Sequence, residues 1–363
     1  MTIQFTLPLR GQVSQMPLPS AFQQPYLRAD SVRRLAAAHG MGTVRRYVPL
    51  EAGYLNCNYR VETDSGHFFV KRHTRIRRSD LELQHRLLTT LQARGLSVGP
   101  PLPDRQGQTW TVVNHLPVTV FPWTAGEHRA GASLSERECV AVGQLLGRTH
   151  QLLAEVGGDQ PQPFLLPPVR AEQSVRRAER LLEMARAHQP QDDFDGLAEA
   201  YLAFVIEQLR QAVHEPDAQP CLTGWQLTHG DFHQLNVIFG PDGGMTIVDW
   251  DRLRAQPRLS ELVRSLVLWF HDPETGAVDL QRTAWVVRGY ADRAPVEPGA
   301  LAQIVDHFWR TKVADLWILD EHYLRGKQTA DELLPSTLNW LRWLAEHRRA
   351  FGETLEAAAH SGN

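Results

Sequence analysis

The sequence predicts an α+β fold of two lobes, with a small lobe built on an antiparallel β-sheet and a larger, mainly helical lobe. Three observations support this prediction. Strand-like patterns of β-branched and aromatic residues recur between residues 44 and 122, and helical periodicity dominates after Gly126. One strand-rich segment, residues 225–248, interrupts those helices. We expect an N-terminal extension (1–45) that packs on the body, a small lobe (46–122) and a large lobe (123–363).

The small-lobe sheet is predicted from alternating segments. NYRVET and HFFVKRH read as an antiparallel hairpin, with Asp64-Ser65-Gly66 as the turn between them. Two further strands are expected around TWTVVNHL and VTVFPW, and Pro122 ends the second. The segment therefore contains enough strands for a small antiparallel sheet.

Two helices accompany these strands. DSVRRLAAAHG in the N-terminal extension carries a short helical pattern with Asp30 or Ser31 as its cap. A longer helix is expected across SDLELQHRLLTTLQARG, with Ser79 as its cap and Gly95 at its end.

The large lobe is expected to begin with a long helix capped by Ser135. Its strand-rich segment contains VIF and TIV on either side of a turn at residues 240–244. Helical periodicity returns in three further stretches, residues 171–187, 195–215 and 280–357.

Composition indicates a soluble globular protein. Hydrophobic residues make up 42% of the 363 residues, charged residues 22%, and the formal net charge is -3. Such a balance lacks the overall basic field of proteins that bind nucleic acid or anionic membranes, so we expect neither partner. Three cysteines, far apart, form no metal or disulfide pattern. Without a visible export signal or apolar span, a cytoplasmic location is expected, and the oligomeric state stays open.

The strand-rich segment contains a dense polar motif, LTHGDFHQLN followed by IVDWD. It places Asp231 in a loop, Asn236 five residues later and Asp249 directly after an apolar strand. Phosphoryl transfer needs a carboxylate that orients the attacking hydroxyl and oxygen ligands for Mg²⁺ on the nucleotide phosphates. These three residues supply both, although turn formation alone is the simpler reading of Asp and Asn in loops.

The stretch HGDFHQLNVIF…IVDWD resembles the catalytic and metal-binding segments of the aminoglycoside phosphotransferase family, within the protein-kinase-like superfamily. Choline kinases and type II homoserine kinases are similar. The resemblance implies a protein-kinase-like two-lobed fold, with Asp231 as catalytic base and Asn236 and Asp249 as Mg²⁺ ligands. It implies an enzyme that moves the γ-phosphate of ATP or GTP to a hydroxyl group of a small molecule.

The same resemblance assigns nucleotide-binding roles in the small lobe. Lys71 of FFVKRH matches the strand lysine that contacts the α- and β-phosphates. Its carboxylate partner is expected on the next helix, at Glu82 or alternatively Asp80, which point in different directions. The segment LEAGYLNCNYRVET, which contains Gly53, matches the loop that covers the phosphates, and backbone groups around Phe121 match the hinge that binds the base.

Three polar residues of the motif have less certain roles. His229 is expected to support the loop by hydrogen bonding rather than to act as an acid or base. His233 is left open between a loop residue and a contact to substrate or phosphate. Asp251 is expected to cap the chain or to pair with Arg252 or Arg264 rather than to bind metal.

The sequence leaves the acceptor undecided among an aminoglycoside, a homoserine-like amino alcohol, a sugar and a protein Ser/Thr, the last implying a bacterial protein kinase of the same fold. A polycationic acceptor would need acidic residues such as Asp315, Asp320 and Glu321, for which a solvated helix face is the alternative. The tryptophans of the C-terminal helices are expected to pack in the core. A catalytically inactive nucleotide-binding module is the competing function.

Overall fold

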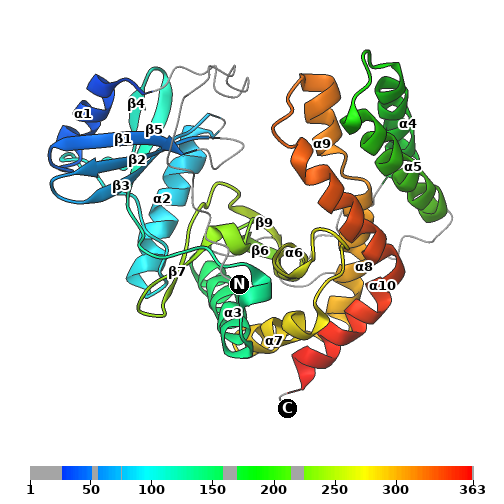
Figure 1. Cartoon of the computed structure of the whole chain (residues 1–363). Helices are drawn as coiled ribbons and strands as arrows, with labels where there is room; N and C mark the ends of the chain where they lie inside the picture. The colour runs from blue at the N-terminus through cyan, green and yellow to red at the C-terminus, as the bar shows by residue number, and fades with distance from the viewer. Residues whose placement is uncertain (1–26, 51–55, 75, 158–169, 214–224, 362–363) are drawn as a thin grey trace.

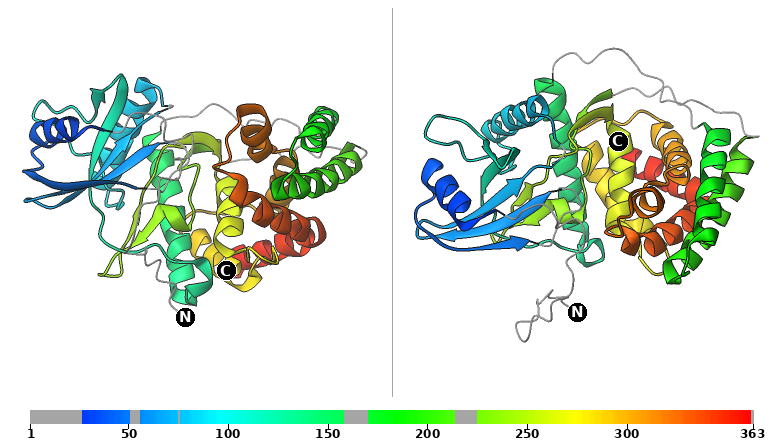
Figure 2. Two further views of the ribbon diagram at one scale, coloured as in Figure 1. Left: turned by 45° about the horizontal axis from the view of Figure 1, so that its top comes forward. Right: turned by 90° about the horizontal axis from the view of Figure 1, so that it is seen from above.

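The computed structural model describes residues 27–50, 56–74, 76–157, 170–213 and 225–361, and it forms the two lobes that the sequence predicts (Figure 1). The small lobe lies at one end of an arc, and helices α4, α5 and α9 lie at the other end. Between them are the strand-rich segment and α6, and the same order is visible in the two further views (Figure 2). The predicted α+β fold of two lobes is confirmed.

The small lobe contains one antiparallel sheet with the strand order β1-β2-β3-β5-β4. The predicted hairpin pairs Tyr59 with Val70 and places Lys71 opposite Thr119 of the next strand. The five strands are β1 (Val44–Leu50), β2 (Cys57–Thr63), β3 (His67–Arg72), β4 (Thr111–Val113) and β5 (Leu116–Pro122).

Helix α1 (Ala29–Ala38) belongs to the small-lobe core, since Val32 and Leu35 share one buried cluster with Val70. Helix α2 (Arg78–Ala93) follows β3. The predicted caps of both helices were wrong. The N-cap positions are Arg28 and Arg77, and neither side chain caps its helix. The predicted cap residues lie inside the first turn of each helix instead. There the carboxylate of Asp30 still interacts favourably with the positive end of the helix dipole.

Eight α-helices are assigned in the large-lobe residues that the structure describes. Ser135 caps the first of them through a reciprocal capping box with Glu138, as predicted. The helices are α3 (Glu136–Val156), α4 (Ala171–Ala187), α5 (Asp193–Val213), α6 (Arg258–Phe270), α7 (Leu280–Ala291), α8 (Ala300–Val313), α9 (Trp317–Leu319) and α10 (Leu334–His360).

The C-terminal helices contribute to the large-lobe core together with α3, α5 and α6. Trp309 and Trp340 are buried there, as predicted, while Trp317 is 39% exposed. In the described part of the chain, no helix combines the length and the apolar character needed to cross a membrane.

The strand-rich segment folds as two small antiparallel pairs. β7 (Val237–Phe239) and β8 (Met245–Ile247) form the predicted hairpin. β6 (Trp225–Thr228) pairs with β9 (Arg254–Pro257), a strand that the sequence analysis missed because RAQP lacks a run of β-branched residues. The two pairs hold the polar motif between them.

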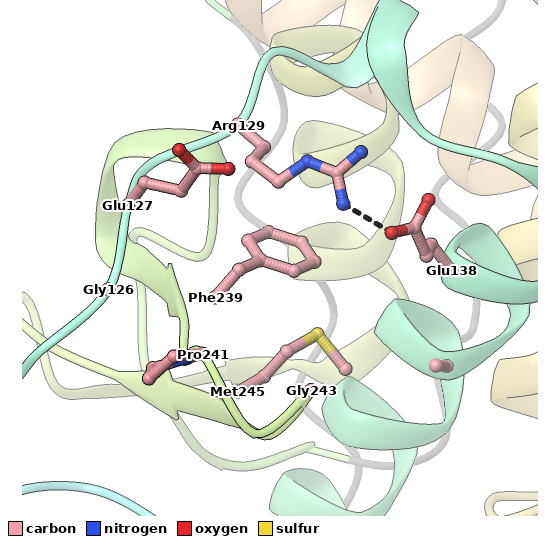
Figure 3. A pocket seen from close by; sticks show the side chains of 10 residues that line it. Gly126, Glu127, Arg129, Glu138, Phe239, Pro241, Gly243 and Met245 are labelled. Carbon is pink, nitrogen blue, oxygen red and sulfur yellow. Dashed lines mark hydrogen bonds and ion pairs between the residues drawn. The ribbon is translucent and has the colours of Figure 1, made fainter.

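A pocket of about 410 Å³ lies where the chain passes from the small lobe to α3 (Figure 3). The Arg129 guanidinium stacks 5.3 Å from the ring centre of Phe239 and pairs with Glu138 at the pocket wall. None of the residues that line this pocket belongs to the polar motif around Asp231.

Candidate active site

The loop that carries Asp231 makes a turn that requires glycine. Gly230 has a φ of +82°, in the left-handed region that residues with a Cβ rarely adopt. A Cβ at this position would also collide with the carbonyl oxygen of Arg252. Gly230 therefore lets the loop approach the segment that follows Asp251.

His229 supports this loop through two hydrogen bonds that fix which nitrogen of its ring carries the hydrogen. Its Nε2 lies 3.0 Å from the Val248 carbonyl oxygen, and its Nδ1 lies 3.2 Å from the Asp231 backbone nitrogen. Because a carbonyl only accepts and a backbone N–H only donates, the hydrogen of the neutral ring is on Nε2. Burial lowers the pKa of His229, which favours this neutral form. These contacts support a positioning role for His229.

Glu261 of α6 stabilises the same loop through hydrogen bonds. The sequence analysis did not predict this role. Its carboxylate accepts hydrogen bonds from the backbone N–H of Gly230 and, at 3.1 Å, from that of His229. His150 Nε2 of α3 lies 2.8 Å from the same group. Although burial would raise the pKa of Glu261, the bond from His150 lowers it, so the buried carboxylate is charged. A charged residue in the apolar stretch RLSELVRSLVLWF was the signal, because buried charges need partners.

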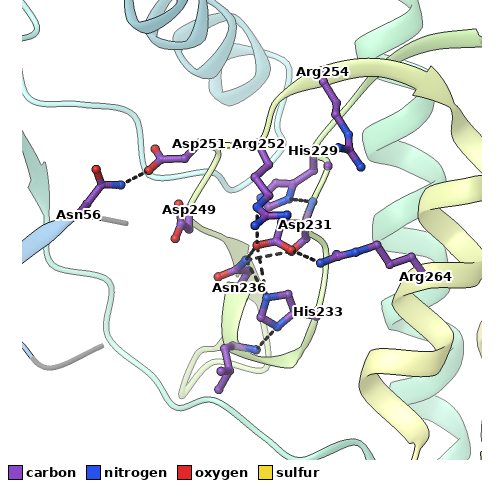
Figure 4. A network of polar contacts seen from close by, with 12 residues as sticks. Asn56, His229, Asp231, His233, Asn236, Asp249, Asp251, Arg252, Arg254 and Arg264 are labelled. Atoms are coloured by element: carbon purple, nitrogen blue, oxygen red, sulfur yellow. Dashed lines mark hydrogen bonds and ion pairs between the residues drawn. The ribbon is translucent and has the colours of Figure 1, made fainter. Parts of the chain in front are cut away.

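Asp231 lies at the centre of a polar network (Figure 4). Arg264 Nη2 is 2.6 Å from Oδ1, and Arg252 Nε and His233 Nε2 are 3.9 and 3.6 Å from Oδ2. Burial alone would raise the pKa of Asp231, but the nearby His233 and the charge of Arg264 hold it well below its usual range. Asp231 is therefore ionised at neutral pH.

The two predicted metal ligands lie side by side. Asn236 Nδ2 donates to the Asp231 carbonyl oxygen at 2.9 Å, which leaves its Oδ1 available to a cation. Val248 N–H donates to the Asn236 carbonyl oxygen at 2.9 Å. Because Asp249 is the residue after Val248, its backbone lies beside Asn236. Asp249 has a φ of +59°, an uncommon conformation for a residue with a side chain.

Lys71 reaches this site from β3. Its Nζ is 2.8 Å from Asp249 Oδ1 and 2.7 Å from Asp251 Oδ2, and the residue is only 4% exposed. Burial would lower the pKa of Lys71, but the charges of Asp251 and Asp249 raise it. Asn56, within the predicted phosphate-covering segment, donates to Asp251 and accepts from the Thr74 backbone nitrogen.

These contacts correct two expectations. Glu82 was expected to pair with Lys71, but Glu82 and its rival Asp80 are exposed on α2, while the sheet-facing side of that helix presents Gln84 and His85. One residue along a helix turns the side chain by about 100°, so Glu82 points away when Leu81 faces inward.

Asp251 was expected to cap the chain or to pair with Arg252 or Arg264. Those arginines approach Asp231, whereas Asp251 contacts Lys71 and Asn56. Asp251 contacts Lys71 because the segment that contains Asp249 and Asp251 lies close to the small lobe.

Two further predictions concern Gly53 and Phe121 of the small lobe. Gly53 lies outside the described residues. Phe121 is on β5, with its ring centre 6.3 Å from that of His85 in an edge-on arrangement and 6.2 Å from that of Phe69. Its predicted backbone contact to a nucleotide base stays a prediction.

The oxygen atoms present fit a magnesium ion that arrives with a nucleotide. Asp249 has 46% of its side chain exposed, compared with 16% for Asp251, so Asp249 is the more accessible of the two carboxylates. Mg²⁺ prefers one or two protein oxygens, with water and substrate phosphates completing its shell. The described residues contain no group of three or more His, Cys, Asp or Glu that could hold a metal ion.

The acidic residues considered for a cationic acceptor already have basic partners. Asp315 lies 2.7 Å from Lys312 Nζ. Asp320 pairs with Arg177, and Glu321 is within reach of both Arg325 and Lys327. These acids therefore do not form an uncompensated negative surface.

A comparison with protein families matches residues 46–297 to the model of a phosphotransferase enzyme family. The chain belongs to this family. The phosphotransferase is 23% identical over 252 residues to a homoserine kinase of Beijerinckia indica subsp. indica, covering 69% of this chain and 72% of the relative. It is 26% identical over 343 residues to a homoserine kinase of Ralstonia nicotianae, covering 88% and 93%.

Among solved structures, a spectinomycin phosphotransferase in complex with ADP and spectinomycin superposes with a TM-score of 0.62 at 15% identity. The match covers 92% of this chain and 99% of that protein. At this identity the similarity shows the fold. Together with the family match, the relatives confirm the prediction of a kinase-type phosphotransferase that acts on a hydroxyl acceptor.

Proposed function

We propose that this phosphotransferase moves the γ-phosphate of ATP, or of GTP, to the hydroxyl group of a small amino alcohol of the homoserine type. The observation that carries the proposal is the convergence at one place of Asp231, Asn236 and Asp249, with Lys71 reaching Asp249 from the small lobe. The acceptor class is supported by the homoserine kinases among the relatives. It is also supported by the compensated charges of the acidic residues that a polycation would need.

In the proposed mechanism, the ionised Asp231 accepts a hydrogen bond from the acceptor hydroxyl and aligns its oxygen for in-line attack. Lys71 exchanges its contact with Asp249 for the α- and β-phosphates, while Asp251 keeps the ammonium in place. Asn236 Oδ1 and the Asp249 carboxylate would hold Mg²⁺, which when bound neutralises charge on the phosphates. Since the transition state is loose, positioning and electrostatic stabilisation supply most of the acceleration.

An acceptor screen tests this proposal. The protein is incubated with Mg-ATP and, separately, with L-homoserine, choline, a hexose, spectinomycin and a Ser/Thr peptide, and products are measured by mass spectrometry. We expect phosphorylated homoserine, and in the Asp231→Asn variant a kcat lower by about 10²–10⁴-fold with nucleotide affinity unchanged.

Other results would support the alternatives. Phosphorylation of the peptide alone would indicate a protein kinase. Nucleotide binding without transfer to any acceptor and without slow ATP hydrolysis, together with no effect of Asp231→Asn, would indicate an inactive nucleotide-binding module.

A further inference from the structure

Three arginine side chains gather around the proposed catalytic base. Arg264 of α6 contacts Asp231 Oδ1 at 2.6 Å, and Arg252 lies 3.9 Å from Oδ2. Arg254 opens β9 directly opposite Thr228, at the beginning of the polar motif. Figure 4 shows Arg254 and Arg264 on the side of Asp231 that faces away from Asp249 and Asp251. Arg254 and Arg264 thus lie on the side opposite the proposed phosphate-binding residues, while Arg252 directly follows Asp251.

The carboxylates nearby do not balance these three positive charges. Asp231 is the carboxylate that Arg252 and Arg264 approach. Glu261 is buried and engaged by His150 and by two backbone N–H groups of the loop. Asp249 and Asp251, on the other side, contact Lys71. Asp231 and Glu261 thus carry two negative charges against the three positive charges of the arginines, so one positive charge remains uncompensated beside the base.

The arginines also retain hydrogen-bond donors. Arg264 Nη1 is buried and has no hydrogen-bond partner among the residues that the structure describes. Arg254 Nε donates to Gln256 Oε1 at 2.9 Å, and both Arg252 and Arg254 are exposed. Partial desolvation and the charges of Arg264 and Arg252 lower the pKa of Arg254, a sign of mutual repulsion. An anion would relieve this repulsion and use the free donors.

A guanidinium binds a carboxylate or a phosphate through two parallel hydrogen bonds. A small acceptor whose hydroxyl reaches Asp231 would place its other groups within a few ångströms of the cluster. Resting on the function proposed above, we propose that Arg252 and Arg254, beside the Arg264–Asp231 pair, bind an anionic group that the acceptor carries next to its reactive hydroxyl. A carboxylate, as in homoserine, meets this requirement, and a phosphate monoester has the same chemistry. A polycationic acceptor is repelled.

Matched pairs of acceptors test the inference. The wild-type enzyme with Mg-ATP is assayed on L-homoserine against L-homoserine amide, and on glycerol 3-phosphate against glycerol, with kanamycin as the polycation. We expect kcat/KM to favour the anionic member of one pair by at least about tenfold, the effect of charge-assisted hydrogen bonds. The favoured pair identifies the group as carboxylate or phosphate.

The variants Arg252→Gln and Arg254→Gln locate the site. Each should raise KM for the anionic acceptor by about tenfold or more, and leave KM for ATP and for the neutral analogue unchanged. Arg349→Gln is the matched control, because Arg349 is 90% exposed on α10 and pairs with Glu353. It should behave as wild type.

The contrary outcomes are separable. Preference for neutral or cationic acceptors would overturn the inference while leaving the phosphotransferase activity intact. Equal losses of kcat with both members of a pair, at unchanged acceptor KM, would also overturn it, because the arginines would then act on the transferred phosphoryl group. Transfer to no acceptor of any class, despite nucleotide binding, would refute the proposed function itself, and the inference with it.

Discussion

Lys71 Nζ lies 2.7 Å from Asp251 Oδ2, so the carboxylate that holds the small-lobe lysine comes from the large lobe rather than from helix α2. Asn56, which belongs to the predicted phosphate-covering segment, contacts the same carboxylate. The link therefore joins both lobes at the proposed nucleotide site. Asp251 and Asp249 are two residues apart, and the structure suggests different tasks for them.

Replacement of each aspartate by asparagine should separate these tasks. Asparagine tolerates the left-handed φ of Asp249, so Asp249→Asn changes charge without straining the backbone. We expect Asp249→Asn to raise the Mg²⁺ concentration needed for ATP binding by roughly tenfold, the cost of about 1.4 kcal/mol of lost attraction. Asp251→Asn should weaken ATP binding at an unchanged Mg²⁺ requirement. Equal shifts in a Mg²⁺ titration of nucleotide binding would refute the assignment of metal binding to Asp249.

The Glu261→Gln variant tests the support beneath the catalytic loop. An amide cannot accept all the hydrogen bonds that Glu261 receives from His150, His229 and Gly230, and its NH₂ group would face N–H donors. We expect the free energy of unfolding to fall by about 3 kcal/mol, measured in urea. Glu346→Gln, at an exposed position of α10, is the control and should change little. An unchanged stability of Glu261→Gln would show that the loop does not depend on this carboxylate.

Two glycines with similar backbone angles allow a matched test of the loop turn. Gly230 and Gly243 have φ values of +82° and +81°, but a Cβ meets open space only at Gly243. Gly243→Ala should cost about 1–2 kcal/mol from the left-handed conformation alone and keep kcat. Gly230→Ala should cost more and lower kcat, because the Arg252 carbonyl must move. Similar losses in thermal unfolding and turnover for both variants would contradict this reading.

Acidification should destabilise the small lobe through its buried histidines. Burial lowers the pKa of His73 to about 4 and that of His85 to about 3, below the usual value near 6.5. Between pH 6.5 and 4 the unfolded chain binds more protons, so stability falls as the pH falls, by up to about 1.4 kcal/mol per pH unit for each group.

Urea unfolding at pH 7.5 and pH 5 measures this loss. His85→Gln, which retains a hydrogen-bonding group for Thr109, should reduce the difference between the two pH values. A difference as large as that of the wild type would show that His85 contributes nothing to the acid sensitivity. His67, exposed on β3, provides the control replacement His67→Gln.

The sequence by itself determined the features that depend on local patterns. Strand alternation predicted the hairpin that presents Lys71, and Ser135 was predicted as the cap that begins α3. The spacing of Asp231, Asn236 and Asp249 indicated phosphoryl transfer, because their order reflects a loop and a hairpin that are local in the chain. The family match agrees with that prediction.

Only the tertiary structure decided which partners these residues meet. Asp251 contacts Lys71 across 180 positions of sequence, and Glu261 and Arg264 reach the loop because α6 packs beneath it. Glu82 was mispredicted for the same reason: the rotation of α2 depends on which side chains the sheet buries. Charge pairing is governed by distance in space, and a local sequence pattern carries no information on the approach of segments from different lobes.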